Sequence, residues 1–274
     1  DEVCAGPAVD TTLPARVAYT PAHPLRLWIG GDSLGDTPGS SVIDQLAPNP
    51  AVGILGPVDT HISTGLARPE VFNWPAFLQA VVTRDLPNAV VLTFGANDDQ
   101  TLTGDGGGEP FGSPAWQAEY RRRVGGLMDI VTGTASHPKL FFVGIPPVKD
   151  MGRFSADYVL INNLINSEAQ ARPGHVYYVD TVSAVGNSAG GYTDALPNPD
   201  GSIAVLRTAD GIHFTRAGGD RIAAKILDAM HRAFDLDSWR TAGSTTTTTT
   251  KAGATRRHRG TTTTTTKTTA APTT

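Results

Sequence analysis

Three short polar motifs combine residue types that together could perform nucleophilic catalysis. A Gly-Asp-Ser-Leu motif contains Ser33, a Gly-Ala-Asn-Asp motif contains Asn97, and an Asp-Gly-Ile-His motif runs from Asp210 to His213. A serine hydroxyl is a weak nucleophile unless a neighbouring base removes its proton. His213 could be that base, and Asp210 could hold the imidazole in one orientation and one tautomer. The motifs therefore predict a triad of Ser33, His213 and Asp210.

Attack by a serine on a carbonyl group also needs hydrogen-bond donors for the oxyanion that forms. The candidates are the backbone N–H of Ser33, the backbone N–H of Gly65 and the side-chain amide of Asn97. Gly65 lies in a Ser-Thr-Gly-Leu segment and could instead serve only a turn.

Other polar residues beside these motifs are candidates for binding a substrate. Arg68 and Arg207 are possible anion-binding residues, although Arg68 could equally form a salt bridge. Asp32 is a third candidate, although a hydrogen-bonding brace for the serine turn is the role that the sequence favours for it. Asp98 and Asp99 are expected in a solvated turn. The single cysteine, Cys4, is a poor start for a metal site, so none is expected.

Strand-like and helix-like patterns alternate along most of the chain. Strands are expected at residues 25–29, 89–94, 140–145 and 176–179, and the apolar runs at 89–94 and 140–145 are typical of strands buried on both faces. Apolar spacing predicts helices over residues 74–83, 114–131 and 154–171, and a last helix capped by Thr215. This alternation predicts a mostly parallel sheet covered on both faces. Ligand sites in such sheets lie at the carboxyl ends of the strands, where the polar motifs occur.

In this order the motifs resemble the four blocks of the SGNH (GDSL-like) hydrolase family. The family is named for its Ser, Gly, Asn and His, which here would be Ser33, Gly65, Asn97 and His213. The resemblance extends from about residue 25 to about residue 234. It implies a three-layer α/β/α sandwich with a mostly parallel, doubly wound, flavodoxin-like sheet of about five strands. It also implies that no metal or organic cofactor is needed.

The resemblance also sets the expected activity. Family members cleave carboxyl esters of lipids, small acyl groups and acetylated sugars, and some transfer acyl groups. Residues 65–69, 72–75 and 206–215 are similar to a bacterial cell-envelope branch of uncharacterised function. We therefore expect ester hydrolysis through an acyl-enzyme on Ser33, with a small-molecule, lipid or glycan ester as substrate. An O-acyltransferase with the same triad and a non-catalytic surface binding module are the alternatives.

Charge and composition divide the chain. An irregular lead-in is expected at residues 1–22, a catalytic domain at 23–240 and a disordered, Thr-rich basic tail at 241–274. Residues 1–240 hold 17 basic and 26 acidic residues, which argues against nucleic acid as the main partner.

No apolar run is long enough for a membrane span. The tail resembles extracellular stalks and could associate with a cell wall. It favours a secreted or envelope location, although a cytoplasmic one stays open.

The tail generates a first prediction. Its composition cannot support a packed core, so removal of residues 241–274 should leave the thermal unfolding midpoint nearly unchanged. Calorimetry of the full and shortened chains would measure this. A large fall in the midpoint on truncation would show that the tail packs on the domain.

Overall fold

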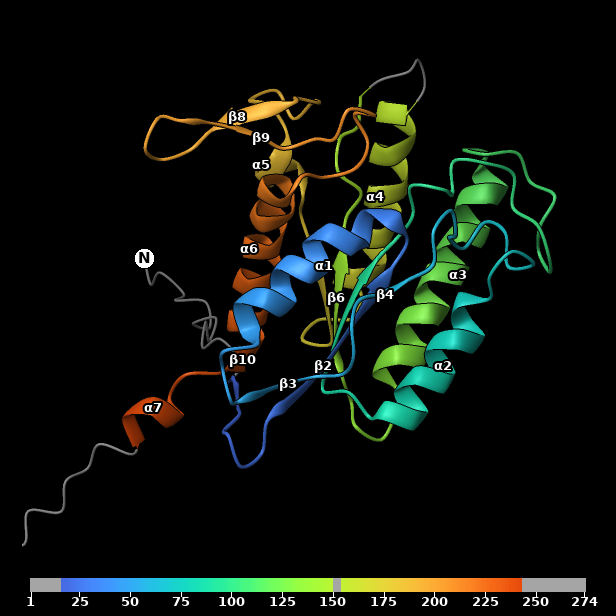
Figure 1. Cartoon of the computed structure of the whole chain (residues 1–274). Coiled ribbons are helices and arrows are strands. Elements are labelled where there is room, and N and C mark those ends of the chain that lie inside the picture. Colours follow the sequence, from blue (N-terminus) through green and yellow to red (C-terminus); the bar gives the residue numbers. More distant parts are fainter. Residues whose placement is uncertain (1–15, 150–153, 243–274) are drawn as a thin grey trace, which may run out of the picture.

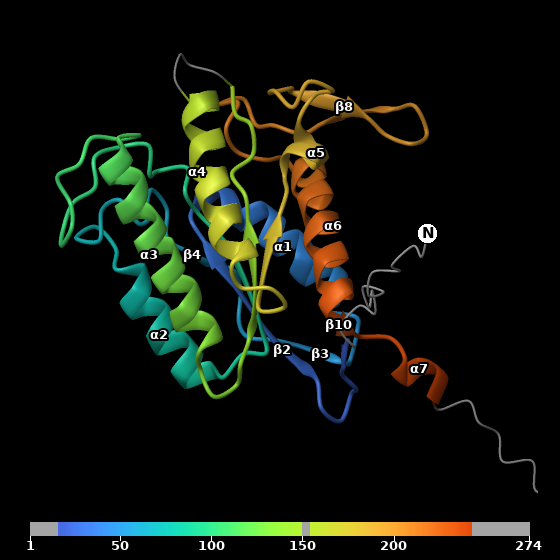
Figure 2. The same ribbon diagram turned by 180° about the vertical axis from the view of Figure 1, so that it is seen from behind.

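The computed structural model describes residues 16–149 and 154–242, and their central feature is a parallel sheet between two layers of helices (Figures 1 and 2). Its strands follow the order β3-β2-β5-β6-β7, the flavodoxin-like arrangement. A short strand, β4, pairs with the end of β2 beyond β3. The bounds are β2 (Leu25–Gly31), β3 (Val52–Ile54), β4 (Asp59–Thr60), β5 (Ala89–Thr93), β6 (Lys139–Val143) and β7 (Val176–Val179). The expected fold class is confirmed.

Helices cover both faces of this sheet. Helices α1 (Ser33–Leu46) and α6 (Arg216–Ala233) pack together on one face (Figure 1). The other face carries α2 (Trp74–Asp85), α3 (Pro114–Thr132) and α4 (Phe154–Gln170), as the reverse view shows (Figure 2). Two short helices, α5 (Val182–Val185) and α7 (Trp239–Ala242), complete the described helices. None of the helices among the described residues is both long and apolar enough to cross a lipid bilayer.

The expected strands and helices form because their side chains suit these positions. All five residues of β5 are buried, as a strand covered on both faces requires. Helices α2, α3 and α6 begin at side-chain caps, since Asn73, Ser113 and Thr215 each accept a hydrogen bond from a backbone N–H of the first turn. The predicted cap at Thr215 is therefore confirmed.

Helix α1 is the main element that the sequence did not predict. It contains two glycines and Pro38, which disfavour a helix in isolation. Asp32 caps its N-terminus, and seven of its residues are buried. Small residues let α1 approach α6 closely, because a Cβ atom on Gly219 would lie 2.7 Å from Cγ2 of Thr37. Tertiary packing thus outweighs the poor helix propensity of this segment.

Two small pairs of strands lie outside the main sheet. Strand β1 (Val17–Ala18) pairs in parallel with β10 (Phe234–Asp235), so the described part of the expected irregular lead-in joins the end of the domain. Strands β8 (Ala195–Pro197) and β9 (Ile203–Val205) form an antiparallel hairpin that was not predicted. Residues 1–15, Cys4 among them, and the tail from residue 243 lie outside the described residues.

Candidate active site

The candidate site lies where the winding of the sheet reverses direction. Strands β2 and β5 are neighbours, and Gly31 at the end of β2 pairs with Thr93 at the end of β5. The chain leaves β2 toward β3 on one side and returns to β5 on the other. Ser33 follows β2 and Asn97 follows β5, so both flank the crevice where doubly wound folds bind ligands.

The structure brings the three residues of the expected triad together. Ser33 Oγ lies 2.9 Å from Nε2 of His213, and Nδ1 of His213 lies 2.7 Å from Oδ2 of Asp210. An ionised carboxylate only accepts hydrogen bonds, so Nδ1 carries the proton donated to Asp210. Nε2 is then left to accept the hydrogen bond of the Ser33 hydroxyl. The geometry is that of a nucleophile, its general base and the group that orients the base.

The Asp210 carboxylate is held by several donors. Its Oδ1 accepts hydrogen bonds from the backbone N–H of Ile212 at 2.8 Å and of His213 at 3.0 Å. The hydroxyl of Thr208 donates to the same oxygen at 2.7 Å. The hydrogen bond from the His213 ring, then that from Ile212, hold the pKa of Asp210 well below its usual range. Asp210 is therefore ionised at any pH where the protein would work.

Arg207 braces the loop that carries this carboxylate and the histidine. It is only 3% exposed, and its guanidinium donates to the carbonyl oxygens of Ile212, at 2.9 Å, and of Pro147. The guanidinium carbon also lies 4.2 Å from the centre of the Phe214 ring. Burial lowers the pKa of Arg207 to about 10. These contacts favour a structural role over the substrate-binding role expected from the sequence.

A cavity of about 440 Å³ opens beside the triad. Such a volume suits a small-molecule ligand. Its lining residues, drawn from five segments of the chain, are Asp32, Ser33, Leu34, Ser63, Ala96, Asn97, Asp99, Gln100, Tyr158, Ile212 and His213. Within the described ranges, no group of three or more His, Cys, Asp and Glu side chains is arranged to hold a metal ion.

The three expected oxyanion donors differ in their position relative to the cavity at Ser33. Ser33 is the first residue of α1, where backbone N–H groups lack partners inside the helix. Asn97 lines the cavity, and its Nδ2 donates to the carbonyl oxygen of Thr64 at 3.0 Å and to Oδ2 of Asp32 at 3.2 Å. Gly65 does not line this cavity, whereas Ser63 of the same loop does. An oxyanion at Ser33 would thus compete with Asp32 for an N–H of Asn97.

Asp98 is a buried residue that holds the Gly65 loop, a role that the sequence did not predict. The expectation of a solvated turn is wrong, because Asp98 is fully buried. Its carboxylate accepts hydrogen bonds from the backbone N–H of Ala67 at 2.7 Å and of Leu66 at 3.1 Å, and from the hydroxyl of Tyr120 at 2.9 Å. Burial raises the pKa of Asp98 to about 6, against the effect of these donors. Asp98 thereby fixes the loop that contains Gly65.

The close packing of Asp98 against this loop leaves room only for glycine at position 65. A Cβ atom at this position would lie 2.1 Å from Oδ1 of Asp98, far inside any permitted contact. The preference for glycine therefore has a steric cause that is independent of any role in catalysis.

Asp32 braces the turn that carries Ser33. It caps α1, because its Oδ1 accepts a hydrogen bond from the backbone N–H of Leu34 at 2.9 Å. Asp32 has no exposed surface, and burial raises the pKa of its carboxyl to about 7. These contacts favour the brace over the substrate-binding role that was its alternative.

Arg68 lies away from this cavity. Its Nε forms an ion pair with Oε1 of Glu70 at 2.9 Å, and both side chains are about half exposed. Of the two roles expected for Arg68, the structure shows the salt bridge.

Solved structures share this architecture. The native aryl esterase of M. smegmatis superposes with a TM-score of 0.52 at 14% identity, covering 77% of this chain and 100% of the esterase. LAE5, an alpha/beta hydrolase enzyme from the metagenome of Lake Arreo, Spain, gives 0.52 at 16%, covering 77% and 97%. Est24, a carbohydrate acetylesterase from Sinorhizobium meliloti, gives 0.50 at 15%, covering 77% and 100%. At these identities the likeness shows the fold, which is the fold that the SGNH resemblance implied.

The sequence itself places the chain in a family. Residues 26–229 match the family described as protein of unknown function (DUF459), and the chain belongs to it. The match runs from β2 into α6 and includes Ser33, Asp210 and His213. No curated protein matches the sequence.

The buried Asp32 generates a prediction about stability. Its pKa is raised in the folded state, so between about pH 4 and 7 the folded protein holds a proton that the unfolded chain releases. Asp32 should therefore lower the free energy of unfolding as pH rises through this range. Asp32→Asn keeps a capping side chain and removes the titration. Urea unfolding at pH 4.5 and 7.5 should show the wild type losing stability relative to the variant by more than about 1 kcal/mol. Equal pH dependence in the two proteins would contradict the raised pKa.

The packing at Gly65 leads to a second prediction about stability. Gly65→Ala should lower the free energy of unfolding by about 1–3 kcal/mol, because the new methyl group must displace the Asp98 carboxylate. Gly53→Ala is a matched control, since its Cβ would find its nearest neighbour at an ordinary 3.6 Å. Chemical denaturation of both variants would measure the difference. If the two behave alike, the loop has room that the structure does not show.

Proposed function

We propose that the protein is a serine esterase that cleaves acyl esters through an acyl-enzyme on Ser33. One observation carries the proposal, namely the chain of hydrogen bonds from Ser33 Oγ through the His213 ring to Asp210 at the crevice of the sheet. The cavity beside Ser33 offers room for an ester. The shared fold of two esterases supports the proposal without carrying it.

The first half-reaction would form the acyl-enzyme. Ser33 Oγ attacks the ester carbonyl carbon while its proton passes to Nε2 of His213. The carbonyl oxygen becomes an oxyanion that receives hydrogen bonds from the Ser33 N–H and the Asn97 amide, with the Gly65 N–H as the third expected donor. The tetrahedral intermediate then collapses, and the alcohol leaves with the proton from His213. Asp210 stabilises the imidazolium while it exists.

The second half-reaction would release the acid. A water molecule attacks the acyl carbonyl carbon as His213 accepts one of its protons. When the bond to Ser33 Oγ breaks, the proton returns to this oxygen and the enzyme is regenerated. If a sugar hydroxyl replaces water, the same steps give an O-acyltransferase.

For the substrate we propose a small acyl ester of an envelope glycan or lipid. The sequence resemblance to a cell-envelope branch motivates the choice, and the name of Est24 records a carbohydrate acetylesterase of this fold. A panel of esters from acetyl to long-chain, with acetylated glycans included, would define the acyl length. Products analysed with and without a glycan acceptor would separate hydrolysis from acyl transfer. A secreted or envelope location is part of the same proposal.

The triad generates a kinetic prediction. Ser33→Ala and His213→Ala should each lower kcat by about 10⁴–10⁶, and the double variant should be little worse, because the residues act as one unit. Ser167→Ala, a serine exposed on α4, should leave turnover unchanged. Hydrolysis of a small chromogenic ester would be followed for all four variants. Strictly additive losses would contradict a shared mechanism.

A further inference from the structure

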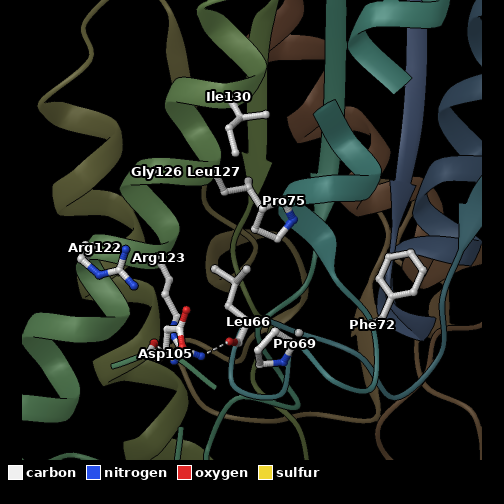
Figure 3. Close-up of a pocket in the computed structure, with 11 residues that line it drawn as sticks. Leu66, Pro69, Phe72, Pro75, Asp105, Arg122, Arg123, Gly126, Leu127 and Ile130 are labelled. Carbon is white, nitrogen blue, oxygen red and sulfur yellow. Dashed lines mark hydrogen bonds between the residues drawn. The ribbon is translucent and has the colours of Figure 1, made fainter. Parts of the chain in front are cut away.

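A second cavity, of about 330 Å³, lies between α3 and the loop that leads into α2 (Figure 3). None of its lining residues lines the cavity at Ser33. The loop around Gly65 separates the two, since Ser63 faces the Ser33 cavity and Leu66 faces this one. Of the residues that line the second cavity, only Gly65 has a part in the proposed esterase chemistry, as the third expected oxyanion donor.

Most of the surface that lines this cavity is apolar. The apolar side chains come from the loop, the start of α2 and the inner face of α3, and they are Leu66, Pro69, Phe72, Pro75, Leu127 and Ile130. Figure 3 shows Ile130, Leu127 and Pro75 toward one end and Asp105 with the two arginines toward the other. Apolar lining with a few polar groups is typical of ligand sites.

Gly126 lines the cavity and is exposed. It lies within α3, yet a Cβ atom built on it would meet no atom within 4 Å. A glycine inside a helix lowers the stability of the helix compared with alanine. The chain thus leaves unfilled a helical position where a larger side chain would have room.

The polar end of the cavity is balanced in charge. Arg122 donates two hydrogen bonds to the carboxylate of Glu119, each 2.7 Å long. Arg123 donates to Glu119 at 2.7 Å and to the carbonyl oxygen of Leu66 at 2.8 Å, a contact drawn in Figure 3. Asp105 is a second carboxylate at this end. Two cations face two anions, so this end favours an uncharged polar group over a carboxylate or phosphate.

We propose that this cavity binds the alkyl chain of an uncharged amphiphile. The chain would lie against Leu66, Leu127 and Ile130, and the hydroxyl-rich head would remain in water beside Arg122 and Asp105. Burial of the alkyl surface would supply most of the affinity. The site does not depend on the proposed ester hydrolysis, so either proposal can fail without the other.

Octyl glucoside below its critical micelle concentration is a suitable probe, because it has an alkyl chain, an uncharged head and no ester. Calorimetric titration of the full chain should give saturable binding with one molecule per protein. Glucose should not bind measurably. Octanoate should bind at least about tenfold more weakly, because its carboxylate would meet Asp105 while both arginines are already paired with Glu119. Absence of saturable binding, or binding of glucose with equal affinity, would overturn the proposal.

Variants then locate the site. Gly126→Leu should fill the cavity and weaken octyl glucoside binding at least about tenfold, with a thermal unfolding midpoint no lower than that of the wild type. Arg121→Leu adds the same side chain at an exposed position of α3 and should bind as the wild type does. Gly126→Ala, a smaller change, serves if the leucine variant does not fold, and it should bind more weakly than the wild type. Wild-type affinity in a folded Gly126 variant, or loss of binding after a phosphonate blocks Ser33, would place the alkyl chain elsewhere.

Discussion

A hydrogen bond between Ser33 and His213 joins residues 180 positions apart, and the geometry of the candidate site depends on it. Neither residue can set this distance alone. Ser33 is fixed by the end of β2 and the start of α1, while His213 is fixed by the loop before α6. Because α1 and α6 pack closely on the same face of the sheet, the two helices hold the hydroxyl and the imidazole 2.9 Å apart. The α1 sequence has low helix propensity, but its small residues at the contact with α6 allow the two helices to pack closely.

Two buried carboxyl groups lie under the site, and each is held by hydrogen bonds. Asp32 caps α1 and contacts Asn97, and Asp98 fixes the backbone of Leu66 and Ala67. Burial of a carboxylate is unfavourable unless donors surround it, which explains both the raised pKa values and the dense donor sets. The two carboxyl groups hold the loop at Leu66 and the start of α1 rigid beside Ser33, which offsets the unfavourable burial.

The sequence predicted the residues that are encoded locally. Ser33, Asn97 and His213 each follow a strand or precede a helix with a clear pattern, so their convergence at one edge of the sheet follows from the α/β topology. Burial of Asp98 could not be predicted, because a carboxylate in a Gly-Ala-Asn-Asp turn gives no periodic signal. Its donors come from α3 and from a loop 31 and 32 residues earlier. Helix α1 was missed since its glycines and Pro38 oppose local propensity. The bracing role of Arg207 depends on Pro147, which is distant in sequence.

Covalent labelling would show whether Ser33 is an activated nucleophile. The full chain would be treated with a fluorophosphonate, its mass measured intact, and the modified peptide sequenced. We expect one adduct per chain, on Ser33, with labelling slowed at least about a hundredfold in His213→Ala because the base is lost. An unlabelled protein, or an adduct on another serine, would show that Ser33 is not activated and would favour a binding module built on the same fold.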